Sequence, residues 1–100
     1  MSPTTGAPDH RRKCSTACFS VSASTDPSVL PRVLETLAKS GQVPNQWHSR
    51  ISESPEKRLE IDFQVFGMET TEAEQIVRAL RRIVFVDTVL TSFKHVEAIA

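Results

Sequence analysis

The sequence has little of several features on which specialised functions depend. It carries no net charge, because 12 lysines and arginines balance 12 aspartates and glutamates. A balanced chain has no general attraction to nucleic acid or to an anionic membrane surface, so we expect neither partner. No apolar run is long enough to span a bilayer. The first residues lack the apolar core of a secretory signal, so the expected location is cytoplasmic.

Cysteine is also scarce, with Cys14 and Cys18 the only two in the chain. Reduced thiols are the default in the cytoplasm, so we predict no disulfide. His10 stands before them in an H-x3-C-x3-C string, but zinc sites ordinarily have four ligands and the sequence offers no second ligand pair. We therefore predict no metal site and no other cofactor.

The sequence contains no pattern typical of catalysis. The three histidines, His10, His48 and His95, fall in a polar arm, on an expected strand and in a tail, with no serine–histidine–aspartate pattern around them. Glu60 and Asp62 lie two residues apart, but alternation along a half-exposed strand already explains such a pair. We therefore predict no catalytic residues and a protein that is not an enzyme.

The length of 100 residues predicts one domain. Residues 1–16 are rich in proline, serine, threonine and glycine and have almost nothing to bury, so we expect a disordered N-terminal arm. The expected domain covers residues 17–94, and residues 95–100 form a C-terminal tail.

Four segments are typical of strands because their side chains alternate or because they are rich in β-branched residues. They are Cys18–Ser24, Val43–Ser52, Arg58–Gly67 and Val84–Phe93. In the second segment Val43, Trp47 and Ile51 share one side. Pro44 cannot donate to a neighbouring strand, so we predict that this segment lies at a sheet edge.

Two segments are typical of helices with one apolar face. The first follows Asp26 and should end at Gly41 in the left-handed conformation; its predicted apolar face consists of Val29, Leu30, Val33, Leu34, Leu37 and Ala38. The second reads TTEAEQIVRALRRI, and we expect Thr71 and Glu74 to form its capping box. Its apolar stripe consists of Ala73, Ile76, Val77 and Leu80.

The predicted order is β-α-β-β-α-β, which is the ferredoxin-like arrangement of the α+β class. One apolar stripe on each helix predicts that both pack on one face of a four-stranded antiparallel sheet. The opposite face carries Glu60, Asp62 and Gln64 on its third strand. Acidic side chains there repel phosphate, which excludes the RNA-binding use of this fold.

Two prolines, Pro27 and Pro31, restrict the start of the first helix. Proline is tolerated only in the first turn, so we predict Ser28 as the N-cap, with Pro31 at the third helical position. The free N–H groups of that turn then belong to Ser28, Val29 and Leu30, and we expect the Ser28 hydroxyl to cap Leu30.

The stretch TDPSVLPRVLETLAKSGQV resembles the first loop and helix of ACT domains, through Asp26, Leu30, Arg32, Val33, Leu37 and Gly41. The later stretch IVFVDTV resembles the corresponding part of the small regulatory subunits of acetolactate synthase. The resemblance covers Cys18 to about Phe93, and it implies the same βαββαβ order that the patterns give.

The resemblance also implies a place for a site. ACT domains typically pair through the strand that follows the first helix, and sensing members hold an amino acid at that seam. The implied ligand-binding residues are Asp26, Ser28, Val29, Leu30, Gln42, Val43 and Asn45. The implied interface residues are Pro44, Gln46, Trp47 and His48.

One departure affects the function that the resemblance implies. Sensing members usually have glycine where this chain has Ser28, and a Cβ there keeps a ligand from the backbone. We therefore expect a regulatory subunit that acts on the catalytic subunit of acetolactate synthase, in branched-chain amino-acid biosynthesis, without a tight amino-acid site. The alternative is a free-standing homodimer that binds an amino acid and regulates another partner.

Overall fold

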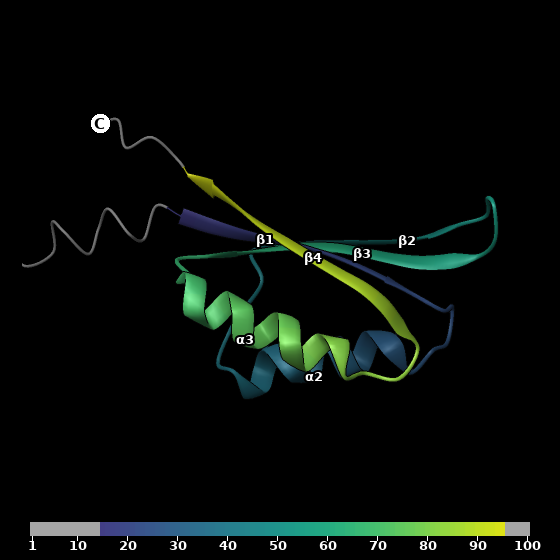
Figure 1. Ribbon diagram of the computed structural model, residues 1–100, viewed down its shortest axis with the longest axis horizontal. Coiled ribbons are helices and arrows are strands. Elements are labelled where there is room, and N and C mark those ends of the chain that lie inside the picture. Colours follow the sequence, from purple (N-terminus) through teal and green to yellow (C-terminus); the bar gives the residue numbers. More distant parts are fainter. Residues whose placement is uncertain (1–14, 96–100) are drawn as a thin grey trace, which may run out of the picture.

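The structure, a computed structural model, describes residues 15–95. Its elements are β1 (Ser15–Ala23), α2 (Val29–Lys39), β2 (Gln46–Ser52), β3 (Arg58–Phe66), α3 (Thr70–Arg81) and β4 (Val86–His95). The strands form one sheet in the order β2-β3-β1-β4, and every neighbouring pair is antiparallel. Figure 1 shows both helices against one face of this sheet. The predicted ferredoxin-like fold is confirmed.

Strand β1 begins at Ser15, three residues before the predicted start. The last two residues of the expected arm therefore lie in a strand. The rest of that arm, residues 1–14, and residues 96–100 of the expected tail lie outside the described residues.

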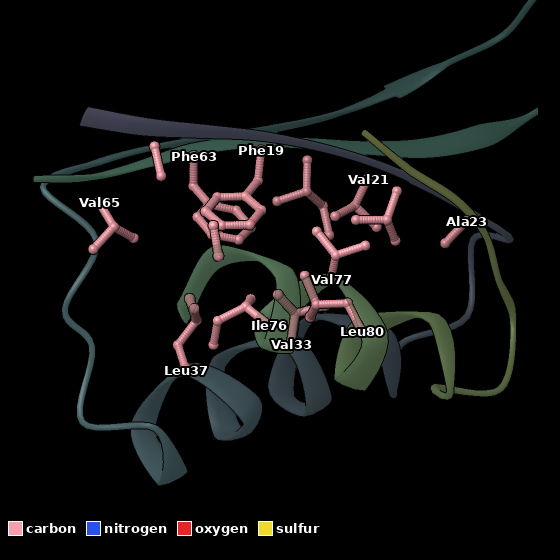
Figure 2. Close-up of a cluster of buried hydrophobic side chains, with 14 of the residues drawn as sticks. Phe19, Val21, Ala23, Val33, Leu37, Phe63, Val65, Ile76, Val77 and Leu80 are labelled. Carbon is pink, nitrogen blue, oxygen red and sulfur yellow. The ribbon is translucent and has the colours of Figure 1, made fainter. Parts of the chain in front are cut away.

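The core fills the space between the sheet and the two helices, as Figure 2 shows. Because strand side chains alternate, each strand sends every second residue to this side. The rings of Phe19 and Phe63 stack there, with centroids 4.8 Å apart, and Trp47 stacks on Phe63 at 5.3 Å. The largest fully buried side chains are Phe63, Leu37, Ile61, Leu80, Val21, Val29, Val33, Val65 and Val89.

Strand β2 lies at an edge of the sheet, as predicted, but the prediction that it starts at Val43 is wrong. The strand starts at Gln46, and Val43 is 80% exposed in the preceding loop. Pairing with β3 begins where the Asn45 N–H donates to the Gln64 carbonyl. Pro44 has no N–H to extend the ladder by another residue.

The apolar face of α2 is narrower than predicted. Val29, Val33 and Leu37, each four residues from the next, are buried, whereas Leu34 is 47% exposed and Ala38 is also exposed. Residues four apart lie on one line along a helix, and this line is fully buried, whereas Leu30 beside it is half-buried against the core.

Helix α3 has a different cap from the predicted one. The capping box joins Glu69 and Glu72, with the Glu72 carboxylate accepting the Glu69 N–H at 3.0 Å, and the prediction of Thr71 and Glu74 is wrong. Glu69 has the extended backbone that an N-cap needs, which places Thr71 inside the first turn. The predicted buried stripe is confirmed, because Ala73, Ile76, Val77 and Leu80 are all buried.

Strand β4 begins at Val86 rather than at Val84. Val84 and Phe85 lie in the turn that leaves α3, where Phe85 has a φ of +82°. Within residues 15–95 no helix is long and apolar enough to cross a membrane.

Helix α2 ends in the predicted left-handed residue. Gly41 has a φ of +73°, its N–H donates to the Ala38 carbonyl, and the Gln42 N–H donates to the Leu37 carbonyl. These two bonds form a Schellman motif, which satisfies carbonyls that a helix otherwise leaves open.

We expect Gly41→Ala to lower the free energy of unfolding by about 1 kcal/mol, because a Cβ disfavours the left-handed backbone. A Cβ added at Gly41 would meet no atom within 4 Å, so no clash contributes to this cost. Urea denaturation measures the change. Ser40→Ala is the control, since it removes only an exposed hydroxyl bond to Thr36. Equal stability of Gly41→Ala and the parent chain would contradict the prediction.

Candidate functional site

The entrance loop, Ser24–Ser28, joins β1 to α2 and is held together by its own polar groups. The Asp26 Oδ1 accepts the Ser28 N–H at 2.9 Å and the Ser28 hydroxyl at 2.7 Å. These two hydrogen bonds stabilise the charged carboxylate, and the nearby Arg32 adds to the effect, so the pKa of Asp26 lies below its ordinary value. The carboxylate of Asp26, one of the implied ligand-binding residues, thus already has partners within its own loop.

Helix α2 begins at Val29 with Ser28 as its N-cap, which confirms the position predicted from the prolines. The expected capping bond, in which the Ser28 hydroxyl oxygen accepts the Leu30 N–H, is absent, and this hydroxyl donates to Asp26. The Val29 N–H donates to the Asp26 carbonyl at 3.1 Å, and Pro31 has no N–H. Few first-turn donors therefore remain for an anion, although a helix start commonly offers several.

The side chain of Val29 is fully buried, so it faces the core and not a ligand at the surface. Leu30 is only half-buried and packs against the edge of the core. Of the predicted ligand-binding residues at this end, Leu30 is the one that offers an apolar side chain.

The second predicted ligand-binding segment, residues 42–45, lies beyond the other end of α2. A helix of 11 residues is about 16 Å long, so this segment and the entrance loop do not meet within one chain. Gln42 contributes its N–H to the end of α2, Val43 is exposed, and Asn45 is exposed with its N–H on β3.

The predicted interface residues lie on and beside the edge strand β2. Gln46 and His48 point to the open face of the sheet, and both are exposed, whereas Trp47 points to the helix side. Trp47 is half-buried and stacks on Phe63, so it covers the end of the core. Pro44 is half-buried in the loop before the strand.

Apolar surface remains exposed on the helix side of the sheet. Ile51 of β2 faces this side, opposite Leu59 of β3, and is 54% exposed. Leu34 of α2 is 47% exposed. We call Ile51 and Leu34 the apolar flank; Ile51 lies on the strand whose outer edge has no partner strand in the described structure.

The open face of the sheet carries a hollow of about 800 Å³. Cys18 and Ser20, small residues on the inner strand β1, line it together with residues of β2, β3 and β4. Two in-register rows of outward residues line it, Gln46–Gln64–Cys18–Ser92 and His48–Asp62–Ser20–Leu90.

Two pairs of polar groups on this face bind each other. The Ser20 hydroxyl donates to Asp62 Oδ1 at 2.8 Å, and Arg50 forms an ion pair with Glu60 at 2.7 Å. Residues 15–95 contain no group of three or more histidine, cysteine, aspartate or glutamate side chains that could hold a metal ion. The hollow presents hydrogen-bonding side chains such as Gln46, Gln64 and Ser92.

Sequence patterns missed two features near the entrance loop. Arg58 donates to the Ser22 hydroxyl and forms an ion pair with Asp87, which links β1, β3 and β4 at this end of the sheet. The Phe85 carbonyl accepts the Ser24 N–H at 2.9 Å. These contacts join residues far apart in the sequence, which local periodicity does not reveal.

Comparison with known proteins gives likeness in structure only. No family model matches the sequence, and no curated protein matches it. The ACT domain of GTP pyrophosphokinase from Chlorobium tepidum is a solved structure with a TM-score of 0.62 at 12% identity, over 77% of this chain and 96% of that chain.

Two further solved structures are similar. The regulatory subunit of aspartate kinase from Thermus thermophilus has a TM-score of 0.60 at 15% identity, over 80% of this chain and 51% of that one. The C-terminal domain of the MgtC protein from Mycobacterium tuberculosis has a TM-score of 0.63 at 10% identity, over 83% and 90%. At such identities the likeness concerns the fold alone, and the fold of this chain is that of ACT domains.

Proposed function

We propose that the chain is a non-catalytic regulatory domain of the cytoplasm, a small subunit that acts on the catalytic subunit of acetolactate synthase. The ACT-type fold supports a regulatory role, because solved neighbours include a regulatory subunit of aspartate kinase. The stretch IVFVDTV supports acetolactate synthase as the enzyme on which the chain acts, because it resembles part of the small regulatory subunits of that enzyme. The observation that carries the proposal is the ACT-type fold, which the regulatory subunit of aspartate kinase shares.

The same proposal includes a homodimer formed through β2. The outer edge of β2 has free backbone groups, and strands with such edges pair readily. Ile51 and Leu34, the apolar flank, would be covered in such a dimer. In an antiparallel pair, the start of β2 in one chain lies beside the end of β2 in the other.

That geometry would bring the two predicted ligand-binding segments together. The end of β2 is level with the end of β1, because Ile51 pairs with Leu59, which pairs with Ala23. Residues 42–45 of one protomer would then approach the entrance loop of its partner. The seam is therefore the place where an effector would bind, as the family resemblance implies.

We infer that this seam binds no amino acid tightly. The Asp26 carboxylate and the Ser28 and Val29 N–H groups are already used within the entrance loop, and Pro31 offers no donor. A ligand would have to break these bonds before it gained its own, which costs affinity. Calorimetry that detects binding of an amino acid at micromolar affinity would favour the alternative, a free-standing sensor.

The dimer predicts that Ile51→Lys converts the protein to a monomer. The substitution places a lysine from each protomer at the seam, where burial of an unpaired charge is unfavourable. Light scattering after size exclusion should show twice the chain mass of 11.1 kDa for the parent protein and the mass of one chain for the variant. Leu90→Lys is the control, because Leu90 is 65% exposed on the open face. A monomeric parent protein would exclude the dimer.

The hydrogen bonds of the entrance loop predict how the pKa of Asp26 responds to a substitution of Ser28. Ser28→Ala removes the hydroxyl bond to Asp26, the largest cause of the low pKa, so the pKa of Asp26 should rise toward its ordinary value. NMR titration of the Asp26 carboxyl measures both proteins. The lowered pKa also stabilises the folded state above the ordinary aspartate pKa, and this contribution disappears as the pH falls through the lowered pKa. An unchanged pKa in Ser28→Ala would show that the loop is held differently.

Co-purification tests the function itself. We expect the tagged chain to retain the acetolactate synthase catalytic subunit of the same organism and to raise its activity. Another thiamine-diphosphate-dependent enzyme from that organism is the control, and it should not be retained. If purified catalytic subunit fails to bind and its activity does not change, the proposed function is wrong.

A further inference from the structure

The turn between α3 and β4 presents two apolar side chains to solvent. Val84 is 63% exposed and Phe85 is 45% exposed. Figure 1 shows this turn at the end of the molecule where β1 also passes into α2. We call Val84 and Phe85 the apolar turn; neither residue gains full burial within the domain.

Phe85 has an unusual backbone for such a side chain. Its φ of +82° makes it the one non-glycine residue with positive φ in residues 15–95. A bulky residue in this region is a genuine outlier, whereas glycine or asparagine adopts it at lower cost. Neither the backbone nor full burial accounts for a phenylalanine here, and such outliers concentrate at functional sites.

The turn is held in place by its backbone. The Phe85 carbonyl accepts the Ser24 N–H at 2.9 Å, and the Val86 N–H donates to the Ile83 carbonyl at 3.1 Å. Ile83 packs against the core. A partner that bound the two side chains would therefore not have to order the loop first, which favours affinity.

Three arginines lie at the end of α3, just before the apolar turn in the chain. Arg78 and Arg81 lie in the last turn of α3, and Arg82 follows as its C-cap. None of these three is in an ion pair within the described residues, whereas the nearby Asp87 is neutralised by Arg58. Arg81 donates one hydrogen bond to the Val89 carbonyl, and Arg82 is exposed.

We propose that the apolar turn, flanked by Arg78, Arg81 and Arg82, is the surface by which the chain docks on the catalytic subunit. The complementary site on that protein is an apolar pocket with carboxylates at its rim. Aromatic side chains and arginine are enriched at such interfaces, with the aromatic side chain at the centre and the charge at the rim. This inference rests on the proposed function and assigns it a surface.

The decisive variant is Phe85→Asn, because asparagine tolerates positive φ and removes the ring without disturbing the turn. Phe66→Asn is the matched control: Phe66 is an aromatic residue that is 54% exposed, on β3, opposite Thr16 at the far end of β1 from Ser24. Thermal unfolding of both variants verifies that they fold. Binding of the purified acetolactate synthase catalytic subunit is then measured by calorimetry.

We expect Phe85→Asn to weaken binding by about tenfold or more and Phe66→Asn to leave it unchanged. Arg82→Glu, a substitution at an exposed position, should weaken binding most at low salt, because screening removes the charge attraction. If the parent chain binds and Phe85→Asn binds equally well, the docking surface is wrong and the proposed function stands. If the parent chain does not bind, both are wrong.

Discussion

The position of strand β1 between β3 and β4 is the constraint on which the rest of this structure depends. This strand hydrogen-bonds to a neighbour on each side, and its side chains must suit both the core and the open face of the sheet. Phe19 and Val21 enter the core and are almost fully buried, while Cys18 and Ser20 leave small side chains on the open face. A single alternating pattern thus produces the stacked rings on one side of the sheet and the hollow on the other.

The chain leaves β1 through a loop whose polar groups hydrogen-bond to one another. Asp26 accepts both the N–H and the hydroxyl of Ser28, and Pro31 removes a donor that would otherwise point outward. A helix start can either offer its N–H groups to a ligand or use them to fix its own geometry. This loop uses the Ser28 and Val29 N–H groups for its own hydrogen bonds to Asp26, so few donors remain for an anion.

The sequence was sufficient for the features that depend on local chemistry. Ser28 and Gly41 follow from the restrictions on proline and from the permissiveness of glycine, and the inward residues of β3 follow from alternation. Contacts between segments far apart in the sequence decided the remaining features. Val43 fits the strand pattern but precedes the first available partner, the Gln64 carbonyl. Leu34 fits the apolar face of α2, but it stays 47% exposed in the described structure. The positive φ of Phe85 has no sequence signal because no glycine marks it.

The candidate site was harder to predict from the sequence than the fold. Its two halves lie at opposite ends of α2 and would meet only across a seam between protomers. The two proposed surfaces, however, belong to opposite edges of the sheet. Strand β2 is one edge, and the apolar turn precedes β4, which is the other. A two-fold dimer through β2 would therefore leave one apolar turn exposed on each protomer, related by the same axis. Dimerisation and docking would then not compete, and one dimer would present two equivalent turns to two catalytic subunits.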